Sequence, residues 1–243
     1  MSPHGTPDWG LVPKSISYGL DDLGEAAVRM GSPHLWDRRG DALYVTDFRE
    51  GLGSFGHGFG GAGGAVLLTT GHSRLGAYSV DLRAGSNAGQ MASMWLALPF
   101  QDPSCVGLEF SFSLDANTSY LVDVVEWFDG TVDHYGCMLY DFVAKELRYR
   151  TTGGAWGVLA TAVQRYVTAV PAHTMKLVVD MELGEYVRFL LDELAFDMRG
   201  IPVWEQLSPM LAYWSLVIEH HGLAATNPDC YIDSVIVTQN EPR

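Results

Sequence analysis

Apolar and polar residues alternate with a period of two along most of the chain. In residues 105–114, CVGLEFSFSL, every second residue from Val106 onward is apolar. Because successive side chains of a strand point to opposite faces, this pattern predicts a strand with one buried face. Other segments behave similarly: SYLVDVVEWF, HYGCMLYDF, KELRYRT, HTMKLVVDM, EYVRFLLDE, YWSLVIEH and YIDSVIVTQ.

Turn signals separate these segments at hairpin spacing, for example Phe128-Asp129-Gly130, Thr152-Gly153-Gly154 and Leu183-Gly184-Glu185. No long segment with the 3.6-residue period of a helix interrupts them, which excludes folds built from parallel βαβ units. The pattern predicts an all-β fold. We expect an antiparallel two-sheet jelly-roll sandwich over residues 41–243.

Residues 1–40 differ from the rest of the chain. They are punctuated by Pro, Gly and Ser and lack periodicity, which predicts an extended N-terminal arm with a short helix near residues 21–30. The arm is too apolar for a solvated tail, so we expect it to pack on its own domain or on a neighbouring subunit. Its candidate docking residues are Trp9, Leu11, Ile16 and Tyr18.

Composition and charge narrow the possible partners. The chain is 47% hydrophobic, which is enough for a sizeable core, and its 29 acidic and 15 basic residues give a formal net charge of −14. Such a surface repels nucleic acid and anionic membranes, because phosphate binding depends on Lys and Arg. No apolar run is long enough to span a membrane, and no signal peptide is visible. The three dispersed cysteines, Cys105, Cys137 and Cys230, favour buried free thiols.

The glycine-rich stretch at residues 51–66 contains a formal G-x-G-x-x-G match at Gly56, Gly58 and Gly61. A dinucleotide-binding loop also needs a helix N-terminus directly after it, to hold the pyrophosphate. The residues that follow are rich in β-branched side chains and have no N-cap. We therefore expect a mobile glycine-rich loop between two strands and no nucleotide cofactor.

Three segments resemble the concanavalin A-like (laminin-G/laminarinase-type) jelly roll. They are HTMKLVVDMELGEYVRFLLDELAFDMRGIP (173–202), with its strand–turn–strand plan and a further short strand at 194–198, the closing YIDSVIVT (231–238), and residues 47–82. The order DRRGD, DF-x-x-GLG and a final VIVTQNEP is also similar to accessory structural proteins of tailed bacteriophages. This second resemblance implies a virion location on the particle exterior, after assembly in the host cytoplasm.

The first resemblance raises the question of glycan hydrolysis, since laminarinase-like relatives use an E-x-D-x-x-E strand. Here LVDVVE supplies Asp123 and Glu126, but Leu121 stands at the nucleophile position. In a regular strand Asp123 and Glu126 would also face opposite sides. The adjacent His220 and His221 would likewise point to opposite faces, and no zinc or Ser-His-Asp motif is present. We expect no enzyme activity, no catalytic residues and no metal site.

The same resemblance suggests a structural calcium ion held by Asp47, Glu50 and Asp233, although three carboxylates are few for calcium and ordinary charged turns are the alternative. It also makes exposed aromatic rings candidates for sugar stacking, and Trp127 and Trp156 lie beside turn signals. Two functions follow. The first is a non-catalytic structural component of a phage-like particle, such as a capsid decoration protein, docked through its arm to other subunits or to itself. The alternative is a carbohydrate-binding module that recognises a glycan.

Overall fold

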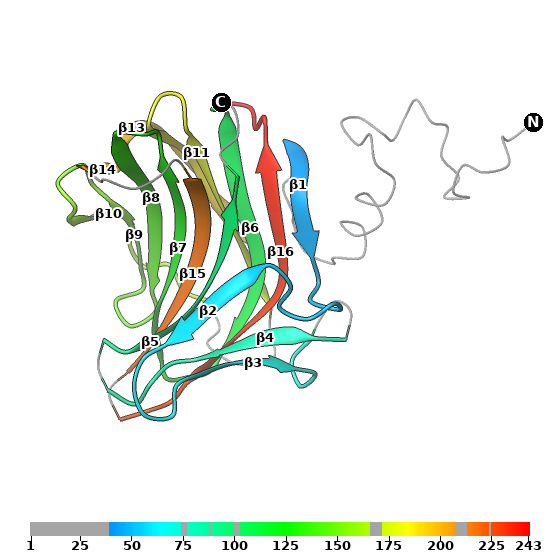
Figure 1. Ribbon diagram of the computed structural model, residues 1–243. Coiled ribbons are helices and arrows are strands. Elements are labelled where there is room, and N and C mark those ends of the chain that lie inside the picture. Colours follow the sequence, from blue (N-terminus) through cyan, green and yellow to red (C-terminus); the bar gives the residue numbers. More distant parts are fainter. Residues whose placement is uncertain are drawn as a thin grey trace, which may run out of the picture.

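The computed structural model describes residues 39–73, 77–87, 89–99, 103–165, 172–207, 213–223 and 225–243. The predicted arm helix and the candidate docking residues Trp9, Leu11, Ile16 and Tyr18 lie outside these ranges. Within them the protein is all-β, with two antiparallel eight-stranded sheets that face each other (Figure 1). The predicted two-sheet sandwich is confirmed. No described segment forms a helix long and apolar enough to cross a membrane.

The first sheet contains residues 173–202 and 231–238, two of the segments that resemble the jelly roll. Its strands are β1 (Asp41–Thr46), β3 (Ala65–Thr69), β4 (Ser79–Arg83), β6 (Cys105–Leu114), β11 (His173–Asp180), β12 (Glu185–Leu191), β13 (Leu194–Pro202) and β16 (Asp229–Gln239). Their order is β13-β12-β11-β6-β16-β4-β3, and β1 also pairs with β16. The consecutive hairpins β11-β12-β13 therefore have the plan expected for residues 173–202.

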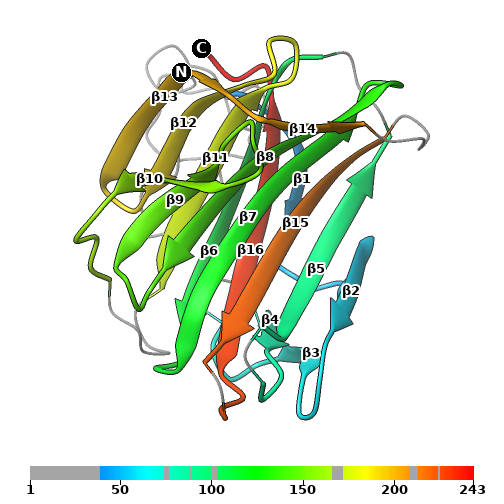
Figure 2. The same ribbon diagram turned by 90° about the vertical axis from the view of Figure 1, so that its left-hand side faces the viewer.

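The second sheet lies across the front of Figure 2. Its strands are β2 (Phe55–Phe59), β5 (Met91–Leu98), β7 (Thr118–Phe128), β8 (Val132–Asp141), β9 (Glu146–Arg150), β10 (Trp156–Ala160), β14 (Trp204–Leu207) and β15 (Tyr213–Gly222). Their order is β10-β9-β8-β7-β15-β5-β2, and β14 pairs with β8 beside β9.

The core fills the space between the sheets with every second side chain of the central strands. Strand β7 contributes Leu121, Val125 and Trp127, and β6 contributes Phe110 and Phe112, all of them at most 1% exposed. Each such side chain is worth about 1.5–3 kcal/mol when buried, so the period-two pattern selects the face that turns inward. The three cysteines are free and buried, as predicted.

His220 ties the two sheets together inside this core. Its Nδ1 lies 2.7 Å from the carbonyl oxygen of Leu82 on β4, and its Nε2 lies 3.1 Å from Thr118 Oγ1. Since a carbonyl only accepts, Nδ1 carries the proton and Nε2 accepts from the hydroxyl. Burial lowers the pKa of His220 to about 4, which keeps the ring neutral. His221 points to the outer face, as the alternation predicted.

Strand β6 was expected to have one buried face, but both of its faces are buried. The polar side chains of its outer face pair with neighbours on adjacent strands. Lys176 Nζ lies 3.7 Å from Glu109 and 2.6 Å from Glu241, and Glu241 also pairs with Arg188. The segment after β16 thus closes an ion cluster over the first sheet.

The structure corrects the prediction for the glycine-rich stretch at residues 51–66. Phe55–Phe59 form edge strand β2, paired with β5, where a mobile loop was expected. Phe55 is buried in the core, while Gly56 and Gly58 occupy the opposite face. A Cβ at residue 56 would lie 2.3 Å from the Trp95 ring, so the missing side chain leaves room for the indole to lie on the strand.

Asp123 provides a test of the core. It is 1% exposed, it faces inward from β7, and neither carboxylate oxygen has a hydrogen-bond partner in the described chain. Burial raises the pKa of Asp123 well above its usual value. The folded state therefore holds a proton that the unfolded state releases above about pH 4, and stability falls as the pH rises. We predict that Asp123→Asn is more stable than wild type at pH 8 and that the difference shrinks toward pH 4.

Urea unfolding of both proteins between pH 4 and 8 measures this difference. Asp197→Asn is the matched control, because Asp197 is exposed and forms its ion pair with Arg199 on the opposite sheet. A pH-independent difference between wild type and Asp123→Asn would contradict the prediction.

Candidate functional site

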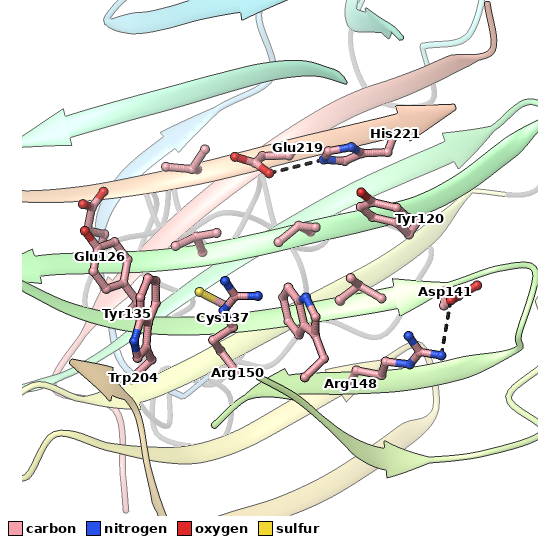
Figure 3. Close-up of a pocket in the computed structure, with 15 residues that line it drawn as sticks. Tyr120, Glu126, Tyr135, Cys137, Asp141, Arg148, Arg150, Trp204, Glu219 and His221 are labelled. Carbon is pink, nitrogen blue, oxygen red and sulfur yellow. Dashed lines mark hydrogen bonds and ion pairs between the residues drawn. The ribbon is translucent and has the colours of Figure 1, made fainter. Parts of the chain in front are cut away.

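A pocket of about 550 Å³ lies on the outer face of the second sheet (Figure 3). It is lined by the outward-facing residues of β7, β8, β9 and β15, together with one tryptophan each from β10 and β14. Its volume is in the range of small-ligand sites. The floor is apolar, since Val122, Cys137 and Leu139 are about 5–6% exposed even though they face outward. Charged and aromatic side chains rise around that floor.

The wall of the pocket depends on a split along one edge of β8. Residues 138–141 of β8 pair with β9, whereas residues 132–135 pair with β14. Gly136 and Cys137 lie at the split, where neither neighbour continues the ladder. The backbone N–H and carbonyl of Cys137 are buried there and need other hydrogen-bond partners.

Tyr186 supplies those partners from the opposite sheet. Its hydroxyl oxygen accepts from the Cys137 backbone N–H at 3.0 Å and lies 3.1 Å from the Cys137 carbonyl and 3.0 Å from the Arg150 carbonyl. The single hydroxyl proton is thus shared between two acceptors. Tyr186 is fully buried, and this burial raises its pKa, which keeps the hydroxyl protonated.

Four side chains stack in a ladder along this wall. The guanidinium of Arg150 lies 4.8 Å from the ring centre of Trp156 and 5.0 Å from that of Trp204. Trp204 in turn stacks on Tyr135 at 4.7 Å, with the two rings 30° apart. The register explains the order, because Trp156 is opposite Arg150 and Trp204 is opposite Tyr135. We call Trp156, Arg150, Trp204 and Tyr135 the stacked wall.

The far end of the pocket is polar. Tyr120 stacks on His221 at 4.1 Å, and His221 Nε2 lies 3.4 Å from Glu219. Arg148 pairs with Asp141 at 3.5 Å, and Figure 3 shows this pair and the His221–Glu219 contact as dashed lines. These side chains complete a pocket with an aromatic wall at one end and a charged rim at the other.

The carboxylates do not form a hydrolytic pair. Strand β7 keeps an unbroken register from residue 121 to 126 with both neighbours, so Asp123 and Glu126 face opposite sides, as predicted. Asp123 faces the core and Glu126 faces the pocket. Glu126 accepts hydrogen bonds from Tyr213 at 2.6 Å and Ser215 at 3.1 Å. Glu219 lies four residues along β15 from Ser215, the partner of Glu126, or about 13 Å away at strand spacing. Glycosidase carboxyl groups are about 5–9.5 Å apart.

One predicted stacking residue lies in the pocket and the other does not. Trp156 is half-buried and lines the pocket. Trp127 is 1% exposed and stacks on His134 at 4.9 Å on the inner side of the sheet. The sequence prediction for Trp127 is therefore corrected. Strand β7 continues through Phe128, so residue 127 keeps the inward face that the alternation gives it.

Sequence reasoning missed three residues of this face. Arg150 and Trp204 belong to the stacked wall, and Trp95 on β5, 38% exposed, lies directly opposite Val217, which lines the pocket. For Trp95 the sequence held an indication. Glycines alternate at residues 56 and 58 of the neighbouring strand β2, which leaves room for a large side chain on that face. For Trp204 and Arg150 no local signal exists, because β14 and β9 meet only where β8 splits.

The carboxylates considered for calcium are engaged separately. Asp47 pairs with Arg49 at 2.7 Å, and Asp233 accepts a hydrogen bond from Ser73 at 3.3 Å. Across the described ranges, no three His, Cys, Asp or Glu side chains are grouped so that they could hold a metal ion.

Comparison of this geometry with known proteins identifies the fold. No protein-family model and no curated protein matches the sequence. Among solved structures, the Emp47p carbohydrate recognition domain is 13% identical at a TM-score of 0.53, over 84% of this chain and 99% of that one. The cellulose-induced protein Cip1 is 11% identical at a TM-score of 0.55, over 80% and 96% of the two chains. The fold is the concanavalin A-like lectin/glucanase type.

Two further structures show how widely this fold is used. A carbohydrate esterase of the Shiga toxin-encoding bacteriophage phi24B is 15% identical at a TM-score of 0.50, over 83% of this chain and all of that one. A sialidase matches 83% of this chain, but this chain spans only 19% of the sialidase. At such identities the likeness concerns the fold, which supports both binding proteins and enzymes.

Tyr186→Phe tests whether the split of β8 depends on the hydroxyl. The ring still fills its place in the core, but the Cys137 N–H and two carbonyls lose their shared partner. We predict a loss of about 1–3 kcal/mol in the free energy of unfolding, the usual cost of unsatisfied buried polar groups. Denaturant unfolding gives the magnitude, and tryptophan fluorescence reports on Trp156 and Trp204.

Tyr140→Phe is the matched control. Tyr140 is also buried and lies on β8, the strand that splits, but its hydroxyl donates to the Val163 carbonyl, away from the split. If Tyr186→Phe had no effect on stability or on the fluorescence spectrum, the hydroxyl would not hold the wall.

Proposed function

We propose that the protein is a carbohydrate-binding module that holds a glycan in the pocket on the outer face of the second sheet. The observation that carries this proposal is the stacked wall, which places two half-buried indoles and the Arg150 guanidinium beside an apolar floor. The C–H groups of a sugar pack on indole edges and apolar side chains, while carboxylates and guanidinium groups bind its hydroxyls. The pocket offers both kinds of group within one face.

Trp95 extends this surface toward the sheet edge. Its ring lies over Gly56, and the row from Trp95 through Val217, Val124 and Cys137 ends at Arg150 on the stacked wall. A ligand of several sugar units could therefore contact indoles at both ends of the row. The fold shared with a carbohydrate recognition domain and with Cip1 supports this proposal.

The particle-docking function is a separate prediction. It depends on the arm at residues 1–40, whose docking residues lie outside the described ranges. The phage esterase has the same fold, but it is described as an enzyme and gives no support for a structural role of this chain. Attachment to a particle or to other subunits therefore stays a prediction from the sequence.

Alanine substitutions of the indoles test glycan binding. We predict that Trp156→Ala and Trp95→Ala each weaken binding at least about tenfold, because buried aromatic anchors carry most of the energy at such sites. A glycan array selects the ligand, and isothermal titration calorimetry gives the affinities. Phe59→Ala is the control, since Phe59 is 57% exposed on β2 but lies on the face opposite Gly56. A wild-type protein that binds no glycan on the array would refute the proposal.

The spacing of the carboxylates gives a further prediction. We expect the protein to release no reducing sugar from β-1,3 or β-1,4 glucans, because Glu126 and Glu219 are too far apart to act on one glycosidic bond. Reducing-sugar assays over long incubations, with an active glucanase as positive control, measure this. Release that disappears in the Glu126→Gln variant would show that the protein is a hydrolase.

A further inference from the structure

Arg150 differs from the other arginines in its choice of partners. Seven described arginines lie within 4.0 Å of a carboxylate, namely Arg49, Arg83, Arg148, Arg165, Arg188, Arg199 and Arg243. Arg150 has no carboxylate at that distance in the described chain, and its charge rests on two indole faces. In a chain with 29 acidic and 15 basic residues, a carboxylate partner would be easy to supply.

The geometry leaves the donors of Arg150 available to a ligand. The guanidinium lies against the rings of Trp156 and Trp204, and its N–H groups donate no hydrogen bond to any residue that the structure describes. Figure 3 shows the guanidinium over the middle of the pocket, beside Cys137. A guanidinium donates two parallel hydrogen bonds from its own plane to two oxygens of a carboxylate or sulfate group. The neutral rings hold the arginine in place without neutralising its charge.

We propose that this pocket recognises a sugar that carries an acidic group, a carboxylate or a sulfate, and that Arg150 binds that group. This inference rests on the proposed glycan-binding function and names its ligand class. The acidic group lies in the guanidinium plane while the sugar ring contacts an indole edge or the floor. A neutral sugar would leave the charge of Arg150 without a counter-ion in a partly buried site.

The rest of the pocket limits how many acidic groups the ligand carries. Arg148 is already neutralised by Glu146 at 2.7 Å and Asp141 at 3.5 Å. Glu126 and Glu219 add negative charge along β7 and β15. The pocket therefore suits one acidic group near the stacked wall and neutral hydroxyl groups elsewhere.

Matched ligand pairs test this inference on the full chain by isothermal titration calorimetry. The carboxylate pair is trigalacturonate and its methyl ester, and the sulfate pair is a sulfated galactan tetrasaccharide and its desulfated form. We expect one acidic member to bind about tenfold more tightly than its neutral form at 50 mM NaCl, and this ratio to shrink at 500 mM. The pair that shows the preference identifies the acidic group.

The variants separate recognition from positioning. Arg150→Gln should weaken binding of the acidic member about tenfold more than binding of its neutral form, and Arg150→Lys should restore part of this preference. Arg199→Gln makes the same charge change on the opposite sheet and should keep the preference. Equal losses for both members in Arg150→Gln would mean that Arg150 only positions the rings, which overturns the inference.

If Arg150→Gln fails to fold, the wild-type affinities alone still test the acidic-sugar inference. Equal wild-type affinity for acidic and neutral members overturns the acidic-sugar inference while glycan binding stands. Binding of neutral glycans alone on the array has the same consequence. Absence of binding to every glycan on the array refutes the proposed function itself, and with it this inference.

Discussion

One hydroxyl group, that of Tyr186, permits the second sheet to open along β8. A strand edge shared by two partners leaves backbone groups without a ladder where the partners change, and buried groups of this kind are costly. Tyr186 reaches across the core and bonds both β8 at Cys137 and β9 at Arg150. Strands β9 and β14 can then follow one another along the same edge of β8, which brings Arg150 of β9 against Trp204 of β14 and Trp156 of β10. The pocket wall is thus a consequence of a hydrogen bond made on the opposite side of the sheet.

The first sheet shares a strand edge in a similar way but closes the gap differently. Along one edge β16 pairs first with β4 and then with β1, while β6 runs along its other edge. The chain after β16 then folds back, and Glu241 pairs with Lys176 and Arg188 over the outer face. The residues after β16 cover polar side chains of the central strands β6 and β11, whereas the outer face of β7 and β8 stays open. The pocket proposed for the glycan lies on this open face.

The sequence predicted what depends on local pattern and missed what depends on pairing. Alternation along residues 105–114 and 119–128 is enough to predict strands, the opposed faces of Asp123 and Glu126, and those of His220 and His221. The turn after Phe128 suggested an exposed Trp127, but the alternation within the strand decided its position. The wall could not be predicted, because Trp204 meets Tyr135 only through the register of β14 on β8. The glycines beneath Trp95 were visible in the sequence, but their meaning required the β2–β5 register.

The charge of the chain and the charge of the pocket act over different distances. The net charge of −14 repels acidic polymers at long range, but at physiological ionic strength this repulsion is screened within about 8 Å. Inside that distance the ligand meets Arg150, whose charge is held by rings and not cancelled by a neighbour. A carboxylate in place of either ring would hold the arginine as firmly but would occupy its donors. If the proposed function holds, an arginine that is held by aromatic faces is what allows an acidic protein to prefer a singly charged sugar over a neutral one.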